Sequence, residues 1–248
     1  MTTTPTIRLA TLALSALSAL GAADFSLTAG TAAPLSEMQV RGTSNQTLAY
    51  HADAAIGWSV GVGLSWRQEE AYDSFQVQHS LLRADDLPAS DQPMMRLAMT
   101  GWRFDLGLTG QRHAGSLQTR DVGDQGEAYT GALFLDALAV ETQVGLGLRF
   151  ANGSAAFLPR TMLVDVGLVG AGGVARAGLA GRWSDPGPYA RYGARLTVSA
   201  PISKQWTLGL AGGWEIVSAS PRWPGTQQVQ VDGSGAVFAL TISTRLGN

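Results

Sequence analysis

The three histidines are the residues best suited to catalysis, and none has the partners that a catalytic site requires. His79 and Ser80 are adjacent in a predicted strand, so their side chains point to opposite faces and cannot form a dyad. His51 and Asp53 share one face, as a carboxylate and imidazole pair would, although a solvated strand end is the commoner explanation. His113 lies in a predicted polar loop, and the three histidines lack metal-ligand spacing.

Two further motifs and the absence of cysteine also limit the chemistry that the chain can perform. Asp85, Asp86 and Asp91 could hold Ca²⁺ on a loop, but solvation of that loop is the favoured interpretation. The glycine cluster Gly170–Gly173 lacks a Walker pattern and a following helix. A chain with no cysteine has no thiolate chemistry, no cysteine-based zinc site and no disulfide. We therefore expect no catalytic residue, cofactor or metal, and no enzymatic activity.

Charged side chains that alternate with apolar ones are the remaining candidates. Val144, Leu146 and Leu148 face one way, for example, while Glu141 and Arg149 face the other. In a barrel, such charges would line a lumen that binds or conducts an anionic or zwitterionic solute, or they would pair across it and fill it. We favour pairing, because an unpaired buried charge costs several kcal/mol. The predicted lumen residues are Arg103, Asp105, Asp136, Glu141, Arg149, Asp165, Arg176, Arg182, Arg191, Arg195, Glu215 and Arg245.

The strands that would position these charges have the alternation of membrane strands. From Trp58 to Trp66, large apolar residues occupy every even position and Gly or Ser every odd one. This length suits a tilted strand that crosses a bilayer core, and an indole stands at each end, where aromatic rings prefer the interface. The stretch from Trp206 to Ile216 repeats the pattern. The predicted interface aromatics are Trp58, Trp66, Trp102, Trp183, Trp206 and Trp214.

Counting such segments, including one over 75–81, predicts an all-β fold: a transmembrane antiparallel up-and-down β-barrel of about twelve strands, with ten as the alternative. Near Asp53 to Ala55 the pattern fits either one long strand or a turn that preserves the phase. Short turns are expected at 68–72, 100–101, 137, 170–173 and 201–204. Mostly longer loops are expected at 34–47, 84–93, 112–126, 151–160, 184–188 and 218–234. Bacterial barrels sort short turns and long loops to opposite ends in this way.

The composition and the N-terminal segment predict that this barrel belongs to the cell envelope. Charged residues are only 15% of the 248 residues, and 31 are Gly. Residues 1–23 resemble a secretory signal, with Arg8, an apolar run and a small-residue cleavage site, which leaves 24–248 as the barrel domain. Loss of Arg8 changes the net charge from −2 to −3, which gives no basis for binding nucleic acid. We expect export to the outer membrane of a Gram-negative bacterium.

A small set of residues, mainly in the C-terminal third, carries a family resemblance. They are Phe25-Ser26-Leu27 after the leader, Pro188-Tyr189, Trp206 after a short turn, Pro221 in the next loop and a closing strand through Thr241. In these the chain resembles the MipA/OmpV family of outer-membrane proteins, whose members usually end on an aromatic residue, whereas this chain ends Leu246-Gly247-Asn248. The resemblance implies a periplasmic cell-wall enzyme as a partner and assigns no functional residue.

These observations predict a non-enzymatic scaffold or surface protein that contacts outer-membrane lipid and presents polar external loops. A porin-like channel for small solutes, with an arginine-rich lumen, is the first alternative. A barrel enzyme that acts on lipid or peptide is the second. The sequence leaves the oligomeric state open.

Overall fold

The described part of the chain is built from β-strands. The computed structural model describes residues 23–42, 47–67, 95–119, 130–152, 161–179, 181–223 and 226–245, and none of these residues belongs to a helix able to span a membrane. The strands are β1 (Asp24–Ala32), β2 (Leu35–Gly42), β3 (Thr47–Arg67), β4 (Met95–Thr119), β5 (Thr130–Asn152), β6 (Thr161–Leu179), β7 (Arg182–Trp183), β8 (Gly187–Pro201), β9 (Trp206–Ala219) and β10 (Thr226–Arg245).

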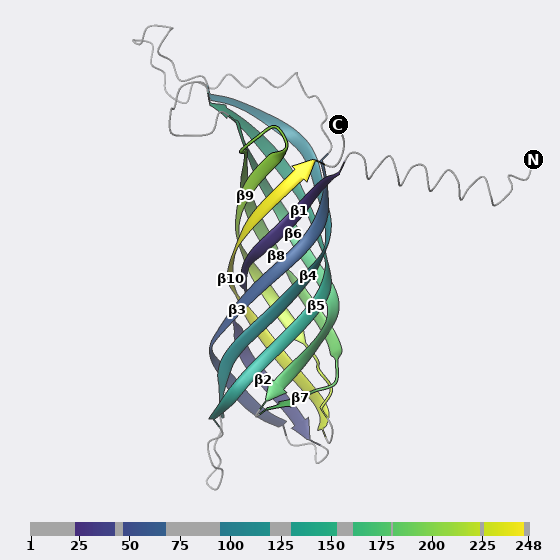
Figure 1. Ribbon diagram of the computed structural model, residues 1–248. Coiled ribbons are helices and arrows are strands. Elements are labelled where there is room, and N and C mark those ends of the chain that lie inside the picture. The colour runs from purple at the N-terminus through teal and green to yellow at the C-terminus, as the bar shows by residue number, and fades with distance from the viewer. Residues whose placement is uncertain are drawn as a thin grey trace, which may run out of the picture.

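These strands form one antiparallel up-and-down sheet that closes on itself (Figure 1). Strands β1 and β2 follow one another in the same position, since both pair with β10 on one side and β3 on the other. Strands β4, β5, β6, β8 and β9 complete a ring of eight positions, and β7 adds a short pairing to β6. Closure leaves the wall without a free sheet edge, which is how a barrel satisfies its backbone hydrogen bonds.

The register determines the tilt of the strands. Followed once around the ring, the pairing that starts at Thr28 of β1 returns at Met38 of β2, ten positions further along. With about 4.7 Å between strands and about 3.3 Å per residue, this stagger corresponds to a tilt of about 40° to the barrel axis. One residue along a strand then advances about 2.5 Å along the axis. A barrel of this size has an interior just wide enough for side chains to fill.

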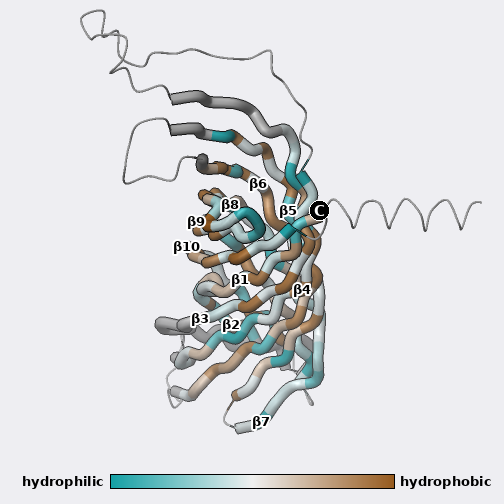
Figure 2. The backbone as a smooth tube through the Cα atoms, turned by 45° about the horizontal axis from the view of Figure 1, so that its top comes forward, coloured by the Kyte–Doolittle hydropathy of each residue, from teal (hydrophilic) through white to brown (hydrophobic). Residues whose placement is uncertain are grey.

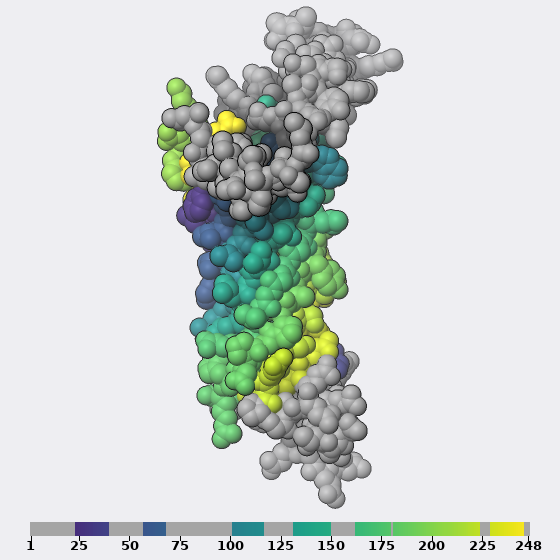
Figure 3. Space-filling model, turned by 90° about the vertical axis from the view of Figure 1, so that its right-hand side faces the viewer, coloured from purple at the N-terminus to yellow at the C-terminus, as the bar shows by residue number. Residues whose placement is uncertain are grey.

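Alternation along each strand separates the two faces of the wall, as the changing colours along the strands in Figure 2 indicate. On β3, Trp58, Val60 and Val62 are about half exposed on the outside. On β5, Val140 and Val144 are likewise outside, while Gln143 between them is buried inside. On the side seen in Figure 3, the wall runs from the blue residues of β3 to the yellow residues of β10.

The hairpin expected at 100–101 is a β-bulge within the single strand β4. Thr100 and Gly101 occupy the place of one residue opposite β5, since Met99 pairs with Leu148 and Gly101 with Gly147. Gly101 has φ of 76°, a left-handed conformation that glycine adopts without the strain that a side chain would add. An inserted residue reverses the phase of a strand just as a tight turn does, so the observed phase reversal did not require a hairpin.

The turns expected at 137 and 170–173 are also absent, because β5 and β6 run continuously through these positions. Gly173 packs tightly on β5, where an added Cβ would lie 2.1 Å from the carbonyl oxygen of Leu138. Its small size therefore serves close strand contact and not a turn. The count of about twelve strands is consequently too high: ten strands are present in the described residues, in eight ring positions.

The structure also bears on the stretch near residue 54 and on two of the expected loops, whereas two predicted segments lie outside the described residues. The stretch at Asp53 to Ala55 belongs to one long strand, β3, with a register irregularity between Asp53 and Ile56. The loops expected at 34–47 and 112–126 contain β2 and the end of β4 respectively. Residues 1–22, with most of the predicted leader, and the strand predicted over 75–81 lie outside the described residues.

The connections do not sort by length as expected. Asp24, Arg245 and the strand ends joined through 68–94, 153–160 and 202–205 lie at one end of the barrel, which we call the terminal end (Figure 1). The strand ends joined through 43–46, 120–129, 180–186 and 220–225 lie at the other, the far end. The loops expected at 84–93 and 151–160 therefore adjoin strand ends at the terminal end, for which short turns were predicted. The misplaced turns account for this error, since each of them reverses the inferred strand direction.

Candidate functional site

Four charged side chains from three strands meet inside the barrel. Arg191 and Arg195 on β8 both contact Glu215 on β9, at 3.1 Å and 2.6 Å between nitrogen and oxygen. Both also contact Glu141 on β5, Arg195 at 3.0 Å. Gly193, between the two arginines, leaves space for Glu215, whose Cγ would lie 2.9 Å from an added Cβ. Each guanidinium thus touches both carboxylates, and we call this group the central ion cluster.

A second group lies nearer the terminal end. Asp165 on β6 is fully buried and accepts hydrogen bonds from Arg67 on β3 and Arg103 on β4, each at 2.8 Å. Arg103 also contacts Asp105 on its own strand at 2.9 Å. We call these four residues the terminal ion cluster. Together the two clusters bring β3, β4, β5, β6, β8 and β9 into contact across the interior through paired charges.

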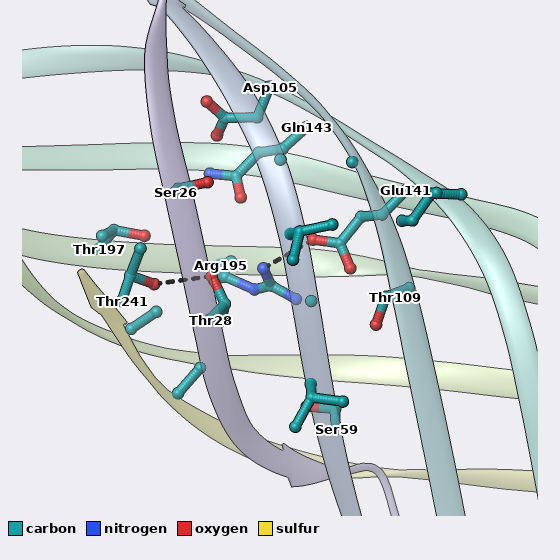
Figure 4. A pocket seen from close by; sticks show the side chains of 18 of the residues that line it. Ser26, Thr28, Ser59, Asp105, Thr109, Glu141, Gln143, Arg195, Thr197 and Thr241 are labelled. Carbon is teal, nitrogen blue, oxygen red and sulfur yellow. Dashed lines mark hydrogen bonds and ion pairs between the residues drawn. The ribbon is translucent and has the colours of Figure 1, made fainter. Parts of the chain in front are cut away.

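The opposite wall of the interior carries small side chains. Ser26, Thr28, Ser59 and Gly61 on β1 and β3 face the charged side, as Figure 4 shows for the labelled members, and Thr28 hydrogen-bonds Thr241 of β10 at 3.1 Å. Between the two sides lies a polar cavity of about 80 Å³. A cavity of this size holds a few water molecules. The ion pairs and this cavity together occupy the middle of the barrel.

The interior of the far end is largely apolar. Its buried apolar residues come from the link between β1 and β2 and from β2, β5, β6, β8, β9 and β10, and they include Ala33, Leu35, Met38, Leu133, Leu135, Ala137, Ala139, Ala175, Ala177, Tyr189, Val217, Ala219, Val229, Val231 and Val237. Tyr189 donates a hydrogen bond to Gln111 at the border with the charged region. We call this group the far-end core. Side chains therefore fill the barrel at the far end as they fill the core of a water-soluble barrel.

The outside changes character along the same axis. On β4 the outward residues are Trp102, Phe104, Leu106 and Leu108, with Gly110 before Arg112. At the tilt derived above, Trp102 and Arg112 lie about 25 Å apart along the axis. We call the zone between them the apolar belt; its exposed members on other strands include Leu27, Val60, Val62, Val140, Val144, Val166, Leu168, Leu196, Leu210, Phe238 and Leu240.

A row of charged side chains ends the belt on three neighbouring strands. Asp136 on β5 pairs with Arg112 on β4 at 3.5 Å and with Arg176 on β6 at 3.6 Å. Arg112 lies over the ring of Phe134 at 5.5 Å, and Arg176 lies over Trp183 at 4.7 Å. We call Arg112, Asp136 and Arg176 the arginine ledge. Elsewhere around the far end the outward residues are polar, among them Glu37, Gln39, Ser116, Ser218, Gln230, Asp232 and Ser234.

The twelve predicted lumen residues divide into three groups. Seven belong to the two ion clusters: Arg103, Asp105, Glu141, Asp165, Arg191, Arg195 and Glu215. Arg149, Arg182 and Arg245 are exposed near strand ends. Asp136 and Arg176 lie on the outer face, which corrects their assignment. The turns wrongly expected at 137 and 170–173 reversed the inferred phase of the residues beside them.

Two residues that lie in the interior were not predicted there. Arg67 continues the inward phase of Ser65, so its place in the terminal ion cluster had a sequence signal. His113 was expected in a polar loop but is fully buried inside β4, and Ser116 points outward. The side chains of His51 and Asp53, and all of His79, Ser80, Asp85, Asp86 and Asp91, lie outside what the structure describes.

The tryptophans lie toward both limits of the belt. Trp102 and Trp206 are exposed near the terminal end, and Trp66 packs on Phe104 with ring centroids 5.8 Å apart. Trp58 and Trp214 are exposed about 20 Å further along the axis, each on the same strand as one of these three. Trp183 lies beyond the belt, against Arg176 of the arginine ledge.

The described residues contain no group of three or more His, Asp or Glu side chains placed to hold a metal ion. The charged groups of the two ion clusters are instead held in mutual ion pairs, an arrangement that fills space and fixes strands. Comparisons with known proteins add no functional assignment: no protein-family model matches this chain, and no curated protein matches it.

Proposed function

We propose that this chain is an integral outer-membrane β-barrel with a closed interior, acting as a non-enzymatic scaffold or surface protein. The reversal of polarity along the barrel axis carries this proposal. Over about 25 Å the wall is apolar outside and charged inside, and beyond the arginine ledge it is polar outside and apolar inside. A barrel surrounded by water throughout has no reason to reverse in this way. A bilayer around the belt, whose height matches the apolar band of such barrels, supplies the reason.

The orientation follows from the even number of ring positions, which brings the start of β1 and the end of β10 to one end. Insertion from the periplasm leaves the terminal end there and carries the far end through the membrane. The far-end core then projects beyond the outer leaflet as a small water-exposed barrel. A leader over residues 1–23 would direct the chain to the periplasm, and the family resemblance supplies the proposal that a periplasmic cell-wall enzyme binds the terminal end.

The interior favours a scaffold over a channel. The central ion cluster joins β5, β8 and β9, and the far-end core fills the barrel below it. A solute would have to break buried ion pairs and then cross the largely apolar far-end core, and both steps are costly.

The polar cavity keeps a small-solute channel as the second candidate. This cavity of about 80 Å³ is lined in part by Arg191 and Arg195, whose guanidinium groups suit anionic or zwitterionic solutes. The purified mature protein, reconstituted into planar bilayers, separates the two functions. We expect flotation with lipid, heat-modifiable migration on a gel and no unitary current. Clear unitary conductance would replace the scaffold by the channel, and a protein recovered entirely in the soluble periplasmic fraction would contradict the barrel itself.

A further inference from the structure

The arginine ledge has more positive charge than its partners neutralise. Two guanidinium groups share the single carboxylate of Asp136, at 3.5 Å and 3.6 Å. The Arg112 side chain is 45% exposed and that of Arg176 is 54% exposed, so both retain donors directed to the surroundings. Arg182, which is exposed at the adjacent strand β7, adds a third positive charge on this side of the barrel. The ledge is therefore a net cationic surface.

Aromatic rings hold both guanidinium groups in place. Arg112 lies over Phe134 and Arg176 over Trp183, and the Phe134 and Trp183 rings themselves approach to 6.4 Å between centroids. Stacking on a ring face occupies the flat side of a guanidinium group and leaves its N–H edge free. Two such edges, on the strands either side of β5, match the oxygens of a phosphate group, which arginine binds in a bidentate manner.

The position of the ledge selects a lipid phosphate. Directly above it on the belt side, Leu138 is 58% exposed on β5 and Val174 is 51% exposed on β6. An amphiphile with a phosphate on the ledge would thus place its acyl chains on the apolar belt. On the opposite side of the ring, Glu37 and Asp232 lie on the outward face, so that side carries negative charge where the ledge carries positive charge.

We infer that the arginine ledge binds the phosphate groups of the outer-leaflet glycolipid, whose acyl chains lie along the belt. This inference rests on the proposed function, because only insertion with the far end outward brings the ledge to that leaflet. The chemistry requires a phosphorylated amphiphile with several acyl chains, and lipid A has both features.

Calorimetric titration of the full mature protein in detergent micelles tests the inference without requiring bilayer insertion. Bisphosphorylated lipid A should bind the unmodified protein, and Arg112→Gln combined with Arg176→Gln should weaken binding about tenfold or more, since each removes charge-assisted contacts. Arg149→Gln, the same exchange at the terminal end, should leave the affinity within about twofold.

Three outcomes would overturn the inference. Equal affinity of the double variant and the unmodified protein would remove the ledge as the site. Equal affinity for dephosphorylated lipid A would show that the phosphate groups are not what the protein recognises. Displacement of lipid A by inorganic phosphate at matched concentration would identify free phosphate as the ligand. Unchanged heat-modifiable migration of the double variant shows that it has folded, and failure of the protein to float with lipid contradicts the proposed function without affecting the micelle result.

Discussion

At the level of the apolar belt, large apolar side chains surround a charged interior; at the far end, polar side chains surround an apolar one. Both regions belong to the same strands and have the same alternation. On β4, for instance, Arg103 and Asp105 point inward within the belt, and His113 points inward beyond it, while Leu106 and Ser116 point outward. The proposed function explains the difference by the medium around each region: lipid would surround the belt and water the far end. The boundary between lipid and water would then lie at the arginine ledge.

The central ion cluster should tolerate change least. Glu215→Ala leaves Arg191 and Arg195 with one carboxylate between them in a closed interior, so we expect a loss of about 3–5 kcal/mol in the free energy of unfolding. Urea titration of the refolded protein in detergent measures this loss. Asp232→Ala, on the polar outside of the far end, is the matched control and should change stability by about 0.5 kcal/mol or less. A loss below about 1 kcal/mol for Glu215→Ala would indicate a well-hydrated lumen.

The far-end core predicts a difference between two leucines on one strand. Leu135 is fully buried and Leu138 is 58% exposed. Leu135→Ala should cost about 2–5 kcal/mol, because it removes buried contacts and leaves a cavity, whereas Leu138→Ala should cost about 1 kcal/mol or less. The same urea titration distinguishes them. Equal losses would mean that the far end is not packed as an apolar core.

Charge on the outer surface tests the boundary itself. Val62 lies near the middle of the belt and Ser116 lies outside the far end. Val62→Arg should hinder insertion by about 2–4 kcal/mol, the cost of arginine at the bilayer midplane of a barrel, while Ser116→Arg should not. The inserted fraction, measured by flotation and heat-modifiable migration, reports the difference. An unaffected yield for Val62→Arg would reverse the assignment of faces.

The bulge in β4 gives the smallest predicted effect. Gly101→Ala forces a Cβ into φ of 76° and should cost about 1–2 kcal/mol. Gly172→Ala adds a Cβ in open space on a regular strand and should be close to neutral. Unfolding of both variants in urea provides the comparison. If Gly101→Ala is as stable as Gly172→Ala, the bulge does not constrain this strand.

Many of the interior charged residues could be predicted from the sequence, because the alternation of side chains along a strand is a local property. Arg191, Arg195 and Glu215 were assigned to the interior from the apolar phase of their own strands, and the structure brings them together. Asp136 and Arg176 show the limit of the method, since a single misplaced turn reverses every side chain beyond it. Local composition near Gly101 and Gly173 predicted turns. In the structure, Gly101 forms part of a β-bulge, and Gly173 allows close contact with β5.

The sequence alone determined that the chain forms strands with one apolar face and one polar or small face, since period-two patterning follows from strand geometry. It also determined that charges stand among the inward residues. Only the tertiary structure decided how many strands close the ring, which charges pair, and that the faces exchange roles at Arg112, Asp136 and Arg176. Those features depend on register between strands distant in sequence, and no single strand carries that information.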